Sequence, residues 1–412
     1  MTPPVYRQQI ALHADPSRVA ARPFLPSDTA RIERIAQRIL ALPPAQIAAL
    51  AADIRARYQG RHRDFDTILA RHAALVMPFV PSALALSEAQ RFVIGATFTL
   101  EYSIEAAALF NPSIVPHPDQ SGIDADARRV ILSFRATGEG HISSLTFRAG
   151  IVSAEGLLQL DPPEPWATLP TLVDHRHLFP PEVPLGERTL FPVMADERMG
   201  IEDVRWVRFD EASDGPTWYG PYTAYDGQRI CPKLLATQDF ATFEVIPLQG
   251  AAVLNKGVAL FPRRIGGEYV MLGRQDNEQN YLMRSARIDR WEEATFLRGP
   301  QSGRELVQIG NNGSPIETEA GWLLLTHGVG PMREYTLSVD LLDLDDPSRV
   351  IATLPHALLA PLPEEREGYV PNVVYSCGAM QHNGWLVIPY AYSDAACNVA
   401  RVRVDELLDA LR

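Results

Sequence analysis

A repeated unit, present from about residue 108 onward, constrains the fold more than any other feature of this sequence. Each unit has a polar loop, a short alternating strand, a turn and a second strand. Unit starts lie near residues 203, 256, 315 and 372, which are 53 to 59 residues apart, and an earlier unit begins at Asn111. One small sheet cannot bury both faces until neighbours stack on it, so this period is typical of propeller blades. We therefore predict an all-β fold, a five-bladed β-propeller over residues 108–412.

Residues 1–107 have a different pattern and are predicted to form a separate N-terminal arm and helical segment. Residues 1–26 are rich in proline and lack periodicity, which predicts an extended arm. Apolar residues then recur at helical spacing, which predicts helices over 27–40, 45–58, 65–77 and 87–110. We expect this helical extension to cap the main domain or to assemble the chain into a homo-oligomer.

Composition excludes several classes of partner. The chain of 412 residues carries a formal net charge of −12, which argues against nucleic acid and anionic membranes, because both attract clustered Lys and Arg. No apolar run reaches the roughly 18 residues of a spanning helix, and the first residues lack a signal-peptide pattern, so we expect a cytoplasmic protein. Cys231, Cys377 and Cys397 are an odd number without metal-type spacing, which favours buried free thiols.

Two acids and an arginine mark the predicted site. Glu202, Asp203 and Arg205 lie where a loop becomes an alternating strand, so a carboxyl group and a guanidinium are held side by side. Protonation of a leaving group needs a carboxyl group that keeps its proton, and we expect Glu202 to raise the pKa of Asp203 by like-charge repulsion. Arg205 is expected to orient a carboxylate through two hydrogen bonds. Blades arranged around one axis would bring the loops that begin the other units close to these three residues, in one central pocket.

Several motifs in a fixed order resemble glycoside hydrolase family 130. They are GIEDVR (200–205), NKGVALFP (255–262), GWLLLTHG (321–328), LLDLDDP (341–347) and YAYSD (390–394). The resemblance covers roughly residues 108–412 and implies an inverting β-mannoside phosphorylase or β-1,2-mannosidase on a five-bladed propeller. It implies no metal and no cofactor, with a carbohydrate substrate and, in a phosphorylase, inorganic phosphate as co-substrate.

The resemblance also assigns roles to individual residues. Asp203 matches the general acid, although Val204 stands where the family usually has proline. Positions that bind phosphate in the phosphorylases are matched by Lys256, Arg274 and His327, with Tyr335 as a further candidate. Hydroxyl-binding candidates head or end strands, and Asp394 matches a position that contacts the mannosyl ring. The predicted substrate-binding residues are Asn111, Arg135, Arg148, Arg205, Tyr222 and Asp394.

Two departures leave alternatives open. Gly257 replaces the polar residue expected after Lys256, and Glu317 stands where phosphorylases often carry lysine. A hydrolase would need a carboxylate to activate water, and Glu317 or Glu139 could be that base. We predict a phosphorylase that cleaves β-mannosides with inorganic phosphate to give α-mannose 1-phosphate. The alternatives are an inverting β-1,2-mannosidase and a sugar-binding propeller without catalysis.

Overall fold

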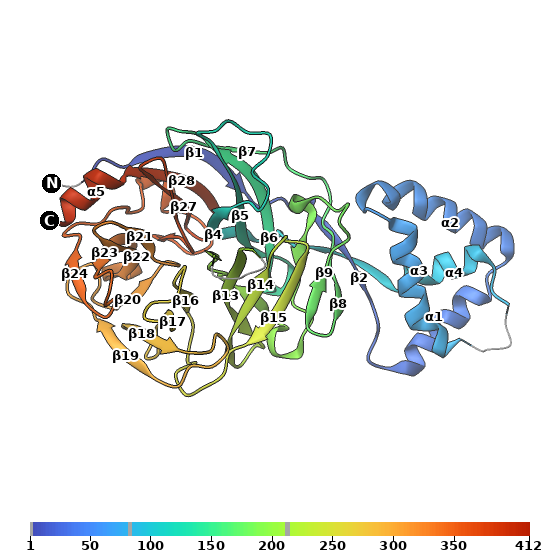
Figure 1. Cartoon of the computed structure of the whole chain (residues 1–412). Coiled ribbons are helices and arrows are strands. Elements are labelled where there is room, and N and C mark those ends of the chain that lie inside the picture. Colours follow the sequence, from blue (N-terminus) through green and yellow to red (C-terminus); the bar gives the residue numbers. More distant parts are fainter. Residues whose placement is uncertain (1–2, 81–84, 211–214) are drawn as a thin grey trace. The chain divides into compact units, whose positions relative to one another are not determined.

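The computed structural model describes residues 3–80, 85–210 and 215–412 and divides into two compact units (Figure 1). The larger unit contains the residues up to 15 together with 105–164 and 169–412, and the smaller one contains 16–104 and 165–168. The larger unit is built mostly of β-sheet, which is the class that the repeated units predict. Strand β1 (Tyr6–His13), which lies in the segment predicted as an extended arm, pairs antiparallel with β28 (Ala396–Arg403) of this unit.

The described residues of the larger unit form four sheets, and Figure 1 shows them following one another in chain order. A 12-stranded sheet joins two groups of strands through the single parallel pairing of Gly200 with Ser143. Its first group is β4 (Ala108–Pro116), β5 (Arg128–Thr137), β6 (Ser143–Val152), β7 (Leu158–Leu160) and β10 (Thr189–Leu190). Its second group is β8 (Thr171–Val173), β9 (Arg176–Leu178), β11 (Gly200–Glu202), β12 (Val207–Phe209), β13 (Thr217–Tyr225), β14 (Ile230–Thr237) and β15 (Thr242–Pro247).

The other three sheets are smaller. The four-stranded sheet contains β16 (Ala259–Leu260), β17 (Tyr269–Gly273), β18 (Asn280–Ser285) and β19 (Ala294–Arg298). The next contains β20 (Gln308–Asn311), β21 (Ile316–Thr318), β22 (Gly321–Val329), β23 (Tyr335–Leu342) and β24 (Val350–Thr353). The last contains β25 (Val374–Tyr375), β26 (Met380–His382), β27 (Trp385–Tyr392), β28 and β1, and helix α5 (Val404–Leu411) follows β28.

Buried apolar clusters join each group of strands to the next. One cluster packs β12 against β16 and β17, and another packs β17 against β22. A third packs β23 against β27 and β28, and a fourth packs β27 and β28 against β4 and β5. Since β6 also shares a cluster with β13 and β15, the series of contacts returns to its starting point. Burial of both faces of each sheet therefore depends on its neighbours, as the repeat pattern predicts.

Four α-helices and a two-stranded sheet are formed by the part of the smaller unit that the structure describes. Its helices are α1 (Thr29–Leu40), α2 (Pro44–Tyr58), α3 (Phe65–Val76) and α4 (Glu88–Thr97), and its strands are β2 (Val19–Pro23) and β3 (Thr99–Ser103). Asp28 caps α1, and a capping box at Ser87 begins α4. The predicted fourth helix is too long, because residues 99–103 instead pair with β2 as a strand. At Gly95 a Cβ atom would lie 2.2 Å from the Leu69 carbonyl oxygen, so glycine is needed for α3 and α4 to approach.

Within the described residues, no single helix is long and apolar enough to cross a membrane, and only the bent pair α1 and α2 meets that test by length and composition. The three cysteines are free thiols, and Cys377 and Cys397 are buried.

Candidate active site

In four of the five repeated units, a residue at the start of the unit has an unusual backbone conformation. Asn111, Asp203, Asn255 and Asn372 have φ values of 50°, 55°, 59° and 64°. Asn and Asp enter this left-handed region more readily than other residues with a Cβ, because their short polar side chains can hydrogen-bond locally. At Asn111 the pairing of β4 with β5 also shifts register, between Phe110 and Ser113. The bulge leaves Asn111 outside the ladder, and its side chain contacts Asp203 instead.

A pocket of about 270 Å³ is lined by residues from all five repeated units. It contains most of the residues that the sequence singled out. Those it brings together are Asn111, Arg135, Asp203, Arg205, Lys256, Arg274, His327, Tyr335 and Asp394.

Asp203 is held by an amide and a guanidinium. The Asn111 side-chain amide donates a hydrogen bond to Asp203 Oδ1 at 2.7 Å, and Arg135 Nη1 lies 3.5 Å from the same oxygen. Arg135 Nη2 donates to Glu202 Oε1 at 2.7 Å. One arginine therefore bridges both acids and fixes the orientation of the Asp203 carboxyl group.

Electrostatics in this pocket differ from the sequence expectation. Burial raises the pKa of Asp203, but the charge of Arg135, the Asn111 hydrogen bond and the charge of Lys256 outweigh it and leave that pKa below its ordinary value. Burial raises the pKa of Glu202, and the charge of Asp203 adds to this. The expectation that Glu202 raises the pKa of Asp203 is therefore wrong for this pocket, because nearby basic side chains dominate.

Arg205 is held by hydrogen bonds within the protein. Its Nη1 donates to Gly257 O at 2.5 Å and to Asn311 Oδ1 at 2.6 Å, and its Nη2 donates to the Tyr375 hydroxyl at 2.8 Å. Arg205 lies in the pocket, but Arg135 is the arginine that contacts the two acids. Arg205 therefore connects its own repeated unit to the three units that contain Gly257, Asn311 and Tyr375.

Arg274 and His327 form a buried chain of hydrogen bonds. The Asn312 amide donates to Ser376 O at 2.6 Å, so its Oδ1 faces His327 Nδ1 at 2.9 Å as an acceptor. Arg274 Nη1 lies 3.2 Å from His327 Nε2, and a guanidinium can only donate. His327 therefore carries its proton on Nδ1. Burial and the charges of Arg274 and Arg205 lower the pKa of His327 well below its ordinary value, so the ring is neutral.

Asp394 is the second carboxyl group of the pocket. It adopts a left-handed conformation with φ of 48°. Burial and the charge of Asp203 raise the pKa of Asp394 to about 7, against the effect of Arg135 and Lys256. Its carboxyl group therefore titrates near neutral pH.

Two predicted sugar-binding residues do not line the pocket. Arg148 is buried, and its guanidinium pairs with Glu105 at 3.2 Å. Tyr222 is buried in an apolar cluster and donates its hydroxyl proton to Glu197 at 2.9 Å. Both structural roles correct the prediction, which used only their places in predicted strands.

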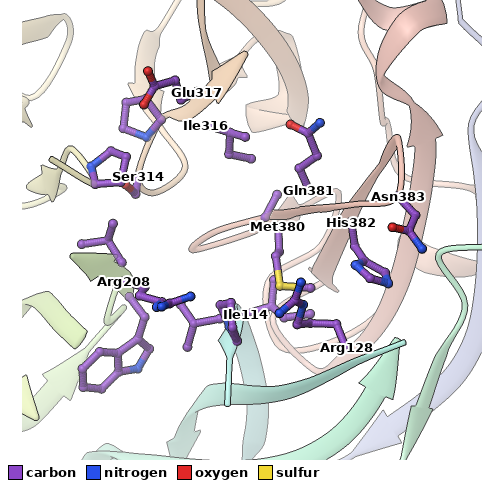
Figure 2. Close-up of a pocket in the computed structure, with 17 residues that line it drawn as sticks. Ile114, Arg128, Arg208, Ser314, Ile316, Glu317, Met380, Gln381, His382 and Asn383 are labelled. Atoms are coloured by element: carbon purple, nitrogen blue, oxygen red, sulfur yellow. The ribbon is translucent and has the colours of Figure 1, made fainter. Parts of the chain in front are cut away.

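The two predicted bases also lie outside the pocket. Glu317 lines a different pocket, shown in Figure 2, and forms a bidentate ion pair with Arg263 at 2.7 and 2.8 Å. Glu139 is exposed in the loop between β5 and β6 and is absent from the lining of the Asp203 pocket. Neither carboxylate is therefore placed to activate a water molecule beside Asp203.

Sequence reasoning missed several lining residues, including Gln308, Arg333 and Tyr375. Tyr375 follows Pro371-Asn372 by a few residues, so the unit alignment could have pointed to it. Burial raises the pKa of its hydroxyl, which therefore stays protonated. Among the described residues, no group of three His, Cys, Asp or Glu is arranged to hold a metal ion.

The site is a carboxyl group facing several basic side chains in a β-sheet pocket. A carboxyl group can exchange a proton with a bound molecule, and basic side chains attract anions. A family model described as beta-1,4-mannooligosaccharide phosphorylase matches residues 183–412. The chain belongs to this family, glycoside hydrolase family 130, and is an enzyme that acts on β-mannosides.

Two curated relatives have related names. A 1,2-beta-oligomannan phosphorylase of Thermoanaerobacter sp. (strain X514) is 33% identical over 230 residues, which cover 52% of this chain and 74% of that protein. A beta-1,2-mannobiose phosphorylase of Listeria innocua is 29% identical over 231 residues, which cover 54% of this chain and 63% of that protein.

Solved structures share the fold at lower identity. The Listeria innocua beta-1,2-mannobiose phosphorylase in complex with beta-1,2-mannobiose has a TM-score of 0.55 and 19% identity, over 74% of this chain and 92% of that one. A structure from work on family 130 glycoside hydrolases that target beta-1,2 mannosidic linkages in Candida mannan has a TM-score of 0.55 and 17% identity, over 74% of this chain and 87% of that one. At these identities the likeness establishes the fold alone.

Proposed function

We propose that this enzyme cleaves a β-mannoside with inorganic phosphate and releases α-mannose 1-phosphate. The observation that carries the proposal is the charge of the pocket. Among the described lining residues, five are Arg or Lys and only Asp203 and Asp394 are acidic. A dianion offsets such an excess of positive charge, whereas a water molecule does not.

Asp203 is proposed to donate its proton to the glycosidic oxygen while a phosphate oxygen attacks the anomeric carbon from the opposite face. The bond from that carbon to the leaving oxygen breaks, and the proton of the phosphate returns to Asp203. Attack from the opposite face turns a β-linkage into an α-phosphate. Lys256 and Arg274 are proposed to hold the anion, and neutral His327 orients Arg274.

Phosphate binding is also proposed to raise the pKa of Asp203, so that its carboxyl group holds the proton that it donates. In the free pocket the basic side chains keep the pKa of Asp203 low, so the carboxyl group is ionised near neutral pH. A dianion beside Lys256 and Arg274 would cancel part of that positive field and raise the pKa of Asp203. Proton uptake should therefore accompany phosphate binding.

The decisive experiment incubates the enzyme with β-1,2- and β-1,4-linked manno-oligosaccharides, with and without phosphate. We expect mannose 1-phosphate only when phosphate is supplied. Free mannose at a phosphate-independent rate would overturn the proposal and support hydrolysis. Binding without any product would support a sugar-binding role.

We further propose that the five groups of strands are the blades of a five-bladed propeller. The series of apolar clusters that returns to its starting point supports this arrangement.

The helical unit is proposed to assemble the chain into a homo-oligomer. Because the Asp15 amide donates to Glu105 at 3.0 Å, residues 16–104 can be replaced by a short glycine linker. A lower solution mass with unchanged turnover would support assembly, and loss of turnover alone in a folded protein would contradict it.

A further inference from the structure

Three loops beside the Asp203 pocket have the same backbone conformation. Each joins two long antiparallel strands, β5 to β6, β22 to β23 or β27 to β28. In each loop two successive residues have φ between 48° and 68°, and the pairs are Gly140 and His141, Met332 and Arg333, and Ser393 and Asp394. His141 and Arg333 therefore occupy in their own sheets the position that Asp394 occupies in its sheet. Both Asp394 and Arg333 line the pocket.

The loop at Met332 is strained and exposed. A left-handed backbone costs an ordinary L-residue roughly 1–2 kcal/mol. Glycine occupies the equivalent position 140, whereas Met332 has 87% of its surface exposed, so burial of its side chain does not offset the cost. Backbone strain that is not offset by side-chain packing is frequent at functional positions.

A strap formed by residues 366–372 connects the three loops. The Tyr369 hydroxyl lies 3.0 Å from His141 Nδ1, and the Val370 amide donates to Ser393 O at 3.0 Å. Arg366 also pairs with Glu334 at 3.1 Å, next to the Met332 loop. The strap is therefore held over the rim of the pocket, and Val370 is one of the lining residues.

The rim combines apolar surface with a basic group. Tyr369 is 50% exposed and Val370 is 36% exposed, in addition to Met332. An aromatic ring offers a face to the C–H surface of a sugar, and the neighbouring Arg333 guanidinium can donate hydrogen bonds to hydroxyl groups. Exposed apolar surface beside polar groups is typical of a binding site.

We propose that Tyr369, Met332 and Arg333 form the acceptor subsite, which binds the sugar that leaves the cleaved bond. The proposal rests on the proposed phosphorolysis. Asn311 and Cys377 are buried and do not line the pocket, whose volume of about 270 Å³ suits one sugar ring with an anion. Since Asp203 protonates the leaving oxygen, the rest of the substrate lies at the rim.

The test uses the reverse reaction, with mannose 1-phosphate as donor and β-1,2- or β-1,4-mannobiose as acceptor. The rate is measured as the release of inorganic phosphate. We expect Tyr369→Ala to raise the KM for the acceptor about five- to tenfold while the KM for mannose 1-phosphate and kcat stay unchanged. Tyr369→Phe keeps the ring, loses the contact with His141, and should remain close to wild type. Phe296→Ala removes a similarly exposed aromatic side chain from β19 and serves as the matched control.

Arg333→Gln should raise the acceptor KM more than the KM for mannose 1-phosphate, because Arg333 also contributes to the positive charge of the pocket. If Tyr369→Ala leaves the acceptor KM unchanged in an active enzyme, or if both variants change only the KM for mannose 1-phosphate, the subsite is overturned. If the wild type shows no phosphate-dependent reaction, the proposed function fails instead. The subsite is then tested by calorimetric titration of Asp203→Asn enzyme with mannobiose, where adding Tyr369→Ala must weaken binding about fivefold.

Discussion

The pocket around Asp203 and the pocket around Glu317 are each lined by residues from all five repeated units, but their charges are arranged differently. The Glu317 pocket is larger, about 530 Å³ against 270 Å³, and Figure 2 shows apolar and amide side chains in it together with two arginines. There Glu317 pairs with Arg263 and Arg208 pairs with Asp210. The lining of the Asp203 pocket has five Arg or Lys residues and two acids, whereas that of the Glu317 pocket has two arginines and one acid. The number of charged side chains, more than the volume, therefore distinguishes the Asp203 pocket.

The strongest test of this comparison exchanges one carboxyl group in each pocket. Asp203→Asn keeps the shape but has no proton to give, so turnover should fall about 10²- to 10⁴-fold. Glu317→Gln should leave turnover unchanged, because its partner Arg263 lies outside the Asp203 pocket. Initial rates with circular dichroism of both variants decide the matter. More than a tenth of wild-type rate in a folded Asp203→Asn enzyme would show that Asp203 is not the acid.

The second test exchanges one arginine in each pocket. Arg274→Ala should raise the KM for phosphate about 10- to 100-fold, since a charge-assisted contact contributes about 1.5–3 kcal/mol, and should change sugar affinity little. Arg263→Ala should leave the phosphate KM unchanged. Phosphate saturation curves at fixed sugar concentration measure both. Equal effects of the two substitutions would contradict a phosphate site at Arg274.

A smaller effect is expected beneath the site. Tyr375→Phe removes the acceptor for Arg205 Nη2 and should lower kcat/KM about three- to tenfold through the loss of one hydrogen bond to a charged group. Gln381→Ala in the other pocket is the control and should have no effect. If Tyr375→Phe matches wild type in kcat/KM, the position of Arg205 does not depend on this bond.

The smallest effect concerns the free energy of unfolding. As pH rises, the contribution of Asp394 to stability should fall, whereas that of Glu317 should rise. The pKa of Asp394 is raised to about 7, so between its ordinary value and pH 7 the folded protein binds the extra proton and stability falls as pH rises. Asp394→Asn should therefore be more stable than wild type above pH 7 and similar to it near pH 4.

The pKa of Glu317 is lowered by its hydrogen bonds to Arg263, so its contribution is present at neutral pH and is lost as pH falls. Glu317→Gln should thus destabilise the protein at pH 8, by no more than about 0.5 kcal/mol because the pair is exposed. Melting temperatures at pH 5 and pH 8 give both signs. An Asp394→Asn enzyme that melts below wild type at pH 8 would contradict the raised pKa.

Local pattern was enough to predict the units, three of the four helices and the acids and bases at the unit starts. Asn111, Asp203 and Asn372 could be recognised because Asn and Asp at a turn before an alternating strand are a local signal. The apolar residues at helical spacing likewise predicted helices that begin near the caps Asp28 and Ser87. The fourth helix was overextended because pairing of β3 with β2 overrides helical periodicity.

Tertiary structure alone decided which polar side chains meet. Arg148 and Tyr222 have the same residue types and strand contexts as true lining residues, but their partners Glu105 and Glu197 lie elsewhere. Arg135 reaches Asp203 across 68 positions of the chain, and Asn312 sets the proton position of His327 through Ser376. The pKa of Asp203 followed from these neighbours and not from adjacent Glu202. Backbone conformation is set by neighbours in sequence, whereas charge and hydrogen bonding act through space, so the sequence determined the loops and the fold determined their chemistry.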